Sequence, residues 1–235
     1  MLARARATGR TAFIADVKLR SPRHGQLIAP ERLEGYVVEL TAAGVDAMST
    51  PTDPVHFGGS LEVAALIRRL CEIPLVRKEF FTNVAQMDES RRAGFDAVQL
   101  SANTMPREAL HAMMARARQL GLEVMIGIRT AAHLRLAVEV EAETVVVNNR
   151  DISVLELDDG AVGASAPLLA SAHRELFVIS ASGLLTPPDM AAAAAAGADA
   201  VMVGTALARS ADPAALIADF RGLTAQARVS KRNRR

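Results

Sequence analysis

Two lysines lie near the ends of short apolar runs, where a charged side chain is uncommon. Lys78 stands in PLVRKEF, and Lys18 ends FIADVK. Because side chains alternate between the two faces of an extended strand, Lys78 and Arg77 point to opposite faces, whereas Asp16 and Lys18 share one. Partial burial disfavours the ammonium form of a lysine and makes it a usable general acid near neutral pH. We therefore expect Lys78 to be a proton donor and Arg77 to be a solvated surface charge.

The segment that follows Lys18 has the length needed to cover a ligand. Ser21 and Pro22 favour a turn, and the loop that they open is long enough to fold over a bound molecule. The alternative is that Asp16 and Lys18 form a salt bridge that only ties this loop down.

Candidate anion-binding residues follow three other apolar runs. Arg150 in NNRD can bind a carboxylate or a phosphate through two parallel hydrogen bonds, although NNRD is equally suited to a turn. Small residues in SASG and VGTA, namely Ser182, Gly183, Gly204 and Thr205, let backbone N–H groups approach an anion closely. For either run alone, a glycine that simply makes a turn is the alternative. The two runs together favour a phosphate site.

A repeated pattern indicates which elements hold these residues in place. A glycine, one spacer residue, Asp-Ala and an apolar run recur as GVDAMS at 44–49, GFDAVQL at 94–100 and GADAVMVG at 197–204. This order is expected where a helix ends at glycine and leads into a buried parallel strand. Extending the pattern predicts eight strands, at 13–18, 46–50, 74–80, 96–101, 122–128, 143–149, 176–182 and 199–204.

Helical patterns alternate with these strands. Apolar residues recur at three- and four-residue spacings in PERLEGYVVELTAAG, SLEVAALIRRL, REALHAMMARARQLG and AAHLRLAVEVEA. Repeats of roughly 27 residues fit an α/β fold of the (β/α)8 TIM-barrel type in a single domain. We place a short N-terminal extension at 1–12, the barrel at 13–224 and a basic C-terminal tail at 225–235. An open doubly wound sheet is the alternative, but no GxGxxG follows the first strand.

The barrel would bring the polar residues above to one end. Ligand sites of this fold lie at the carboxyl ends of the strands, and the loops after strands seven and eight often bind phosphate. SASG and VGTA are those two loops in the predicted order of strands.

Composition and charge narrow the class of partner. The chain of 235 residues has 27 basic and 26 acidic residues and a formal net charge of +1, which gives no electrostatic argument for nucleic acid or an anionic membrane. The single cysteine, Cys71, excludes an internal disulfide. The N-terminus lacks the apolar segment of a secretory signal, and no uncharged apolar run reaches 18 residues. We expect a cytoplasmic protein, monomeric or weakly homodimeric, that binds a phosphorylated small molecule and neither nucleic acid nor membrane.

Six strings match one known family in order and spacing: VKLRSP, HFGGS, LVRKEF, VVNNRDI, SASGL and DAVMVGTAL. Over about residues 13–222 the chain resembles indole-3-glycerol phosphate synthase. The resemblance implies a TIM-barrel carboxy-lyase of tryptophan biosynthesis that closes the pyrrole ring of an anthranilate-derived deoxyribulose phosphate. Carbon dioxide and water would be lost, with no metal and no organic cofactor.

The resemblance also implies roles for individual residues. Lys78 is similar to the family's general acid, which protonates the substrate ketone. Lys18 resembles the lysine that meets the substrate's carboxylate and phosphate, and Asn148 the asparagine that orients its polar groups. The implied substrate- and phosphate-binding positions are Ser21, Phe57, Arg150, Ser182, Gly183, Gly204 and Thr205.

Three positions depart from the family pattern. Asp16 stands where the family has a glutamate, which is longer by one methylene. Gly127 in VMIGIRT stands at the position of the general-base glutamate, and Ala181 at that of a second glutamate on strand seven. Loss of a positioned acid or base costs about 10²- to 10⁴-fold in rate. We therefore expect an enzyme altered in activity or substrate. The alternatives are a paralogue acting on another phosphorylated or carboxylated adduct, and a non-catalytic phosphosugar-binding protein.

A replacement for the missing base could come from a loop histidine. His24 and His56 follow strands one and two and titrate near neutral pH, although most loop histidines are only solvated. Arg129 could reach into the space at Gly127, or a bulkier ligand could fill that space. Glu79 adjoins the predicted general acid but points to the opposite face, so it is a poor substitute.

Overall fold

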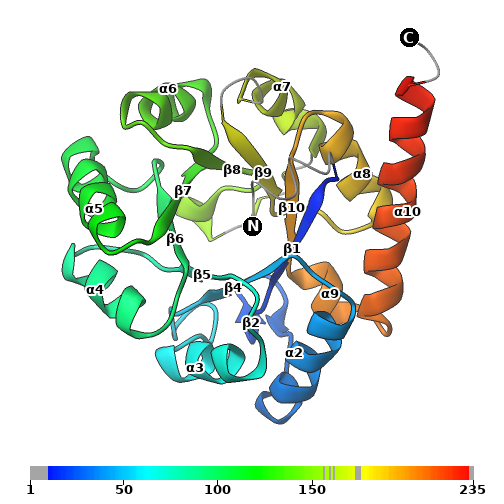
Figure 1. Cartoon of the computed structure of the whole chain (residues 1–235), viewed down its shortest axis with the longest axis horizontal. Coiled ribbons are helices and arrows are strands. Elements are labelled where there is room, and N and C mark those ends of the chain that lie inside the picture. The colour runs from blue at the N-terminus through cyan, green and yellow to red at the C-terminus, as the bar shows by residue number, and fades with distance from the viewer. Residues whose placement is uncertain (1–9, 156, 159, 161, 173–175, 233–235) are drawn as a thin grey trace.

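The eight predicted strands close into one parallel barrel (Figure 1). A computed structural model describes residues 10–155, 157, 158, 160, 162–172 and 176–232, without the side chains of 226–232. The (β/α)8 prediction is confirmed, and each strand end lies within one or two residues of its predicted place. In order around the barrel the strands are β1 (Ala12–Asp16), β4 (Ala47–Pro51), β5 (Leu75–Lys78), β6 (Ala97–Ser101), β7 (Glu123–Ile128), β8 (Thr144–Asn148), β9 (Phe177–Ala181) and β10 (Ala200–Val203), which pairs with β1.

Helices surround the barrel and alternate with its strands (Figure 1). The four predicted helices are confirmed as α2 (Leu33–Ala42), α3 (Leu61–Leu70), α5 (Arg107–Gln119) and α6 (Ala131–Glu139). The other described helical segments are η1 (Pro30–Arg32), α4 (Ala85–Arg92), η2 (Ile152–Val154), α7 (Val162–Ala172), α8 (Pro187–Ala195), α9 (Thr205–Arg209) and α10 (Pro213–Arg232). Helix α10 continues through residues 225–232 of the expected basic tail, and residues 1–9 of the expected N-terminal extension lie outside the described residues.

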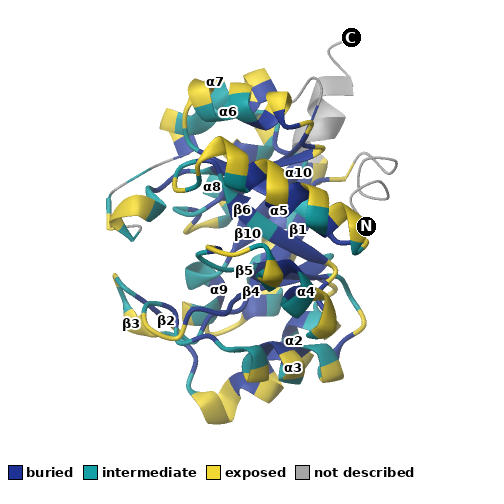
Figure 2. Cartoon of the chain, turned by 90° about the vertical axis from the view of Figure 1, so that its left-hand side faces the viewer, coloured by how far each residue is buried: buried dark blue, intermediate teal, exposed yellow. Residues whose placement is uncertain are grey.

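The strands are buried on both faces, as expected for a parallel sheet covered by helices. One face fills the barrel interior with side chains such as Ile14, Val76 and Phe177. The opposite face packs beneath the helices, where Val98 and Leu100 belong to a second cluster. Figure 2 shows the buried barrel at the centre and exposed residues on the outward sides of the helices. The barrel interior is therefore filled with apolar side chains. A ligand would have to bind at the carboxyl ends of the strands, which we call the rim.

The Gly-x-Asp repeat fixes neighbouring strands at their amino ends. Gly44, Gly94 and Gly197 all have positive φ (74°, 84° and 115°), a conformation that ends a helix and that other residues adopt at a cost. Each aspartate two residues later accepts a backbone N–H of the adjacent strand: Asp46 from Phe13 at 2.9 Å, Asp96 from Leu75 at 2.8 Å and Asp199 from Val178 at 2.9 Å. The repeat thus couples a helix stop to a strand-pairing hydrogen bond.

Helix α10 closes the ring of helices against the first β/α unit. The Phe220 ring meets the Phe13 ring edge to face, with centroids 5.3 Å apart. The Arg221 guanidinium donates to the backbone carbonyls of Ala43, at 3.2 Å, and Gly44. Helix α10 therefore packs against β1 and against the residues that follow α2.

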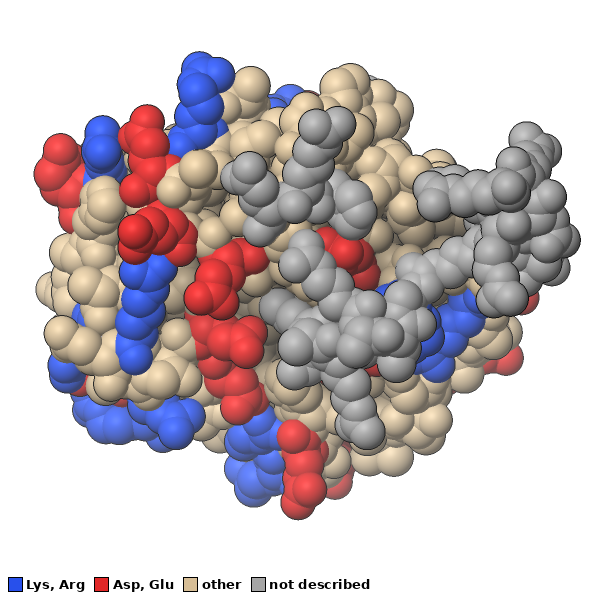
Figure 3. All heavy atoms as spheres, turned by 45° about the horizontal axis from the view of Figure 1, so that its top comes forward, with Lys and Arg blue, Asp and Glu red and all other residues tan. Residues whose placement is uncertain are grey.

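The surface carries mixed charge. On the face shown in Figure 3, acidic and basic side chains lie next to one another rather than in separate areas. Among the described residues, no helix combines the length and apolar character that a membrane crossing requires.

Removing one aspartate of the repeat should weaken the barrel without touching its rim. We expect Asp46→Ala to lower the free energy of unfolding by about 1.5–3 kcal/mol, because a charge-assisted hydrogen bond to a buried backbone N–H is lost. Urea unfolding at pH 7 measures this. Asp219→Ala, at an exposed position of α10, is the matched control and should change the value by less than about 0.5 kcal/mol. Equal effects of the two substitutions would contradict the role of the repeat.

Candidate active site

Two cavities open at the carboxyl ends of the strands, and Lys78 lines both. The first, which we name the aromatic cavity, is lined by residues that include Phe57, Phe80, Lys78, Gln99, Ser101 and Asn148. The second, the loop cavity, is lined by residues that include Lys18, Lys78, Arg150, Ser182, Gly183 and Thr205. The structure thus brings most of the predicted site residues together around one lysine.

A buried carboxylate holds the two lysines. Asp16 is 5% exposed, and its Oδ2 lies 3.1 Å from the Nζ of Lys78 and 3.7 Å from the Nζ of Lys18. The Ser49 hydroxyl donates to its Oδ1 at 2.6 Å. Burial by itself raises the pKa of Asp16, but the two ammonium groups and the Ser49 hydroxyl outweigh it and hold that pKa below its usual value. The predicted Asp16–Lys18 salt bridge exists, and it is shared with Lys78.

Aromatic rings form one wall of the aromatic cavity. The Phe57 and Phe80 rings are stacked, with centroids 6.4 Å apart and an interplanar angle of 28°. The Nζ of Lys18 lies 5.8 Å from the Phe57 centroid, within the range of a cation–π contact. Gly59 fixes this turn, because a Cβ there would stand 1.9 Å from the carbonyl oxygen of Pro51. The wall offers a flat apolar surface beside a cation.

The loop cavity combines cationic side chains with strained small residues. Arg150 is 8% exposed, and its Nε is buried without a hydrogen-bond partner among the described residues. Ser182 and Gly183 both have positive φ (64° and 67°), an uncommon conformation for serine that is found at ligand sites. A Cβ at Gly204 would stand 2.9 Å from the backbone oxygen of Asp16. Small residues here allow close approach, and Arg150 has unused donor capacity.

The space beside Gly127 is bordered by two amides. A Cβ at this position would lie 3.2 Å from the Nδ2 of Asn148 and 3.5 Å from the Nε2 of Gln99. The Arg129 side chain lies elsewhere, with its guanidinium 3.2 Å from Asp158 and 3.7 Å from Asp151. Of the two alternatives for this space, the one in which Arg129 reaches into it is not seen, because Asp151 and Asp158 hold the guanidinium. Ala181, at the other departure, is buried in the barrel interior.

Several predicted residues lie apart from the two cavities. The Ser21 hydroxyl accepts the backbone N–H of His24 at 3.2 Å within a hairpin formed by β2 (Arg20–Ser21) and β3 (Gly25–Gln26), and Ser21 lines neither cavity. Burial and the nearby guanidinium of Arg209 hold the pKa of His24 below its usual value. The Nδ1 of His56 lies 3.2 Å from the Asp53 carboxylate. Neither histidine side chain lines a cavity.

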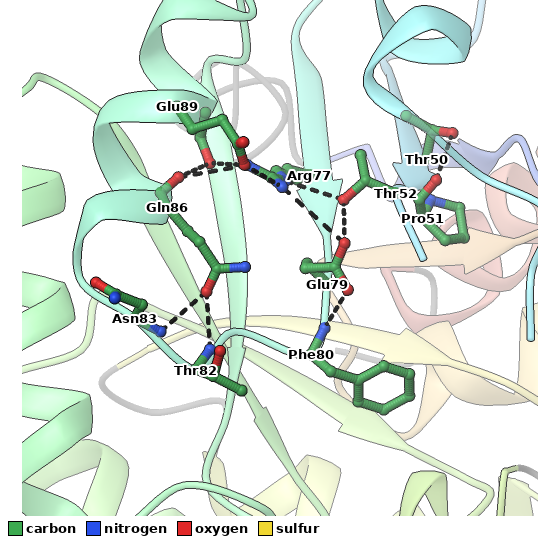
Figure 4. A network of polar contacts seen from close by, with 11 residues as sticks. Thr50, Pro51, Thr52, Arg77, Glu79, Phe80, Thr82, Asn83, Gln86 and Glu89 are labelled. Carbon is green, nitrogen blue, oxygen red and sulfur yellow. Dashed lines mark hydrogen bonds and ion pairs between the residues drawn. The ribbon is translucent and has the colours of Figure 1, made fainter. Parts of the chain in front are cut away.

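Arg77 is a buried cation, so the expectation of a solvated charge is wrong. Its side chain is 4% exposed, and it pairs with Glu89 of α4 at 2.7 Å and donates to the Thr52 hydroxyl at 3.0 Å. Thr52 in turn donates to the Glu79 carboxylate at 2.5 Å, which also accepts the backbone N–H of Phe80 (Figure 4). The alternation of side chains along β5 correctly placed Arg77 on the face opposite Lys78. Helix α4 covers that face, which is why Arg77 is buried. Glu79 borders the aromatic cavity, but its carboxylate is held in this network.

Three polar residues of the site were absent from the sequence prediction. Ser49 of β4 holds Asp16, and Gln99 and Ser101 of β6 line the aromatic cavity. The signal for the last two was available, because Gln99 and Ser101 continue the alternation of the inward-facing Ala97. Among the described residues, no group of three or more histidine, cysteine, aspartate or glutamate side chains is arranged to hold a metal ion.

Comparison with known proteins gives one family. The sequence model of the family described as "Indole-3-glycerol phosphate synthase" matches residues 2–220. An indole-3-glycerol phosphate synthase of Kineococcus radiotolerans is 35% identical over 207 residues, covering 88% of this chain and 74% of the relative. The protein of that name from Pyrococcus abyssi is 32% identical over 211 residues, covering 88% of this chain and 90% of the relative.

Solved structures support the fold alone. A structure described as "Native KDPGal structure" has a TM-score of 0.65 and 20% sequence identity, and the match covers 92% of this chain and 95% of that one. A designed cube-shaped protein cage matches with the same TM-score and identity, over 95% of this chain and 75% of the cage chain.

The Asp16 ion pairs should make stability depend on pH. A carboxylate whose folded pKa is depressed stabilises the fold above its unfolded pKa of about 4, and this contribution is lost as the pH falls through the folded value. We expect Asp16→Asn to lower the free energy of unfolding by about 3 kcal/mol at pH 7, because the buried Lys18 and the partly buried Lys78 both lose their ion pair with this carboxylate. The difference from the native chain should shrink as the pH falls below about 4.

Urea unfolding of both chains at several pH values between 7 and 3 measures this difference. Asp219→Asn is the control, since Asp219 is an exposed residue of α10. A gap between native chain and Asp16→Asn that stays constant over this range would contradict the assignment.

Proposed function

This chain belongs to the indole-3-glycerol phosphate synthase family, and on that premise we propose that it is a carboxy-lyase that closes the ring of a phosphorylated anthranilate–sugar adduct, with its rate or substrate altered at Gly127 and Ala181. The observation that carries the proposal is the position of Lys78. It borders both the aromatic cavity and the loop cavity, so a substrate with an aromatic ring at one end and a phosphate at the other would place its middle at the Lys78 ammonium.

The loop cavity supports binding of the phosphate end. Arg150 brings a guanidinium whose Nε is buried without a partner among the described residues, and Lys18 brings a second cation. Anions are bound favourably where such donors are already desolvated and positioned. Ser182 and Gly204 leave room for backbone groups to approach the phosphate oxygens.

Lys78 would protonate the substrate ketone during ring closure. As the ketone carbon bonds to the ring carbon that bears the carboxylate, the oxygen takes the proton of the ammonium and carbon dioxide leaves. The hydroxyl then departs as water, with a proton taken from the ring methylene next to the nitrogen, and the double bond of the pyrrole ring forms between the two carbons. Asp16 keeps Lys78 charged and oriented, and the Ser49 hydroxyl fixes Asp16.

The same ion pair opposes a different role for Lys78. A lysine that attacks a carbonyl as an amine must lose its proton, and a carboxylate 3.1 Å away stabilises the protonated form. Acid catalysis is therefore favoured over a Schiff-base mechanism at this position.

The residue changes at the rim explain why the rate or substrate would differ. Gly127 and Ala181 carry no group that can take a proton, and two carboxylates that line the cavities are held by other residues, Asp16 by Lys78 and Glu79 by Thr52. Loss of a positioned base costs about 10²- to 10⁴-fold in rate. A water molecule would then have to accept the proton in the dehydration step.

A turnover assay with carboxyphenylamino-deoxyribulose phosphate tests this function. We expect slow release of indole-3-glycerol phosphate by the native chain and loss of that activity in Lys78→Met, because no other described ammonium borders both cavities.

We expect Gly127→Glu combined with Ala181→Glu to raise kcat about 10²-fold or more, since a carboxylate base is restored.

Urea unfolding of each variant separates a loss of catalysis from a loss of folded structure. Each variant should unfold at a urea concentration close to that of the native chain before its rate is compared. Native turnover that survives Lys78→Met would refute the assignment of the general acid, and absence of both turnover and binding of the adduct in the native chain would refute the proposed function.

A further inference from the structure

A glutamine on the barrel wall has unused hydrogen-bonding capacity. The Oε1 of Gln99 is buried and has no hydrogen-bond partner among the described residues. Gln99 lines the aromatic cavity and lies in register with Lys78 on the neighbouring strand. Buried polar atoms in proteins are normally paired, and an unpaired one is costly. Because the Gln99 side chain lines the cavity, its amide suits a hydrogen-bonding group that arrives with the ligand.

The absence of a side chain at Gly127 makes room for this amide. The Nε2 of Gln99 would lie only 3.5 Å from a Cβ at Gly127, and the Nδ2 of Asn148 would lie 3.2 Å from it. Ser101, the next inward position of β6, lies in register with Gly127 and also lines the cavity. Two amides and a hydroxyl thus form a neutral polar wall where a carboxylate would otherwise stand.

The same cavity also has apolar, aromatic lining. The Phe57 and Phe80 rings, stacked at an interplanar angle of 28°, border the same cavity. Aromatic faces of this kind pack against another ring. A ligand that satisfied both walls would be a ring with a hydroxyl or amino group on its edge.

We propose that the aromatic cavity is a specificity subsite for a hydroxylated or aminated aromatic ring, whose substituent forms a hydrogen bond with the side-chain amide of Gln99. This inference rests on the proposed function, because the ring is taken to be the arylamine end of the phosphorylated adduct. The neutral wall selects a neutral donor, and Lys78 remains at the junction with the phosphate end. The substrate then differs from the unsubstituted adduct at the ring.

We expect a large difference in affinity between substituted and unsubstituted rings, because the hydrogen-bonding group that would be left unpaired belongs to the protein. A site built to hydrogen-bond a hydroxyl or amino group rejects an analogue that lacks it, since its own buried polar atom is then left unpaired. We expect a hydroxylated ring to bind at least about tenfold more tightly than the unsubstituted ring.

Binding of non-reactive probes tests the subsite independently of turnover. The probes are carboxyphenylamino-deoxyribulose phosphate with its ketone reduced to an alcohol, which cannot close the ring, and the same compound with a hydroxyl at each open ring carbon in turn. Calorimetric titration of the native chain should show at least one hydroxylated probe binding about tenfold or more tightly than the unsubstituted one.

Two variants separate the role of Gln99 from a general change of the protein. Gln99→Met keeps the length of the side chain but removes the amide, and it should abolish the preference by weakening the hydroxylated probe. Gln119→Leu, at an exposed glutamine of α5, should retain the native preference. The native comparison needs no variant, so it remains decisive even if Gln99→Met does not fold.

The outcomes are distinct. If the unsubstituted probe binds as tightly as every hydroxylated probe, or if Gln99→Met retains the preference, the subsite is overturned while the proposed function stands. If no probe binds the native chain, the proposed function fails and the subsite fails with it. A preference in the native chain that Gln99→Met removes and Gln119→Leu keeps supports both.

Discussion

The carboxylate of Asp16 is the interaction on which the rim of the barrel depends. Two ammonium groups lie at the same buried point, and without an anion between them they would repel one another. The surrounding residues accommodate this carboxylate. Ser49 donates to it from the neighbouring strand, and Gly204 has no Cβ because that atom would stand 3.0 Å from its Oδ2. A residue that resembles a shortened family glutamate thus organises three strands.

This arrangement joins two chemically different cavities. The loop cavity offers cations and small residues, and the aromatic cavity offers stacked rings and side-chain amides. Because Lys78 lines both, a ligand that spans the two cavities would place its middle against the Lys78 ammonium. Binding energy from remote groups can in this way orient the reacting centre. Under the proposed function, Gly127 and Ala181 would alter the groups around that centre while the lining of the two ends is kept.

Local patterns in the sequence were sufficient for the fold. Helix stops, strand starts and helical periodicity are encoded within a few residues, and the barrel topology then brings strand ends together. Contacts between distant segments were harder to predict. The face of Arg77 followed from alternation, but its burial depends on Glu89 of a helix that packs over it. Gln99 is a polar residue in the middle of β6 rather than at its end. In the proposed subsite its amide uses the room that Gly127 leaves on β7, two positions beyond Met125, the residue paired with Gln99.

The Gly-x-Asp repeat has a consequence for how this barrel can change over evolution. Its aspartates bind neighbouring strands at the amino ends, and the ligand cavities lie at the carboxyl ends. Substitutions at the carboxyl ends of the strands therefore leave the aspartate hydrogen bonds at the amino ends intact. Substitutions that change the cavity lining can therefore be tolerated, because the hydrogen bonds that fix neighbouring strands lie at the other end of the barrel.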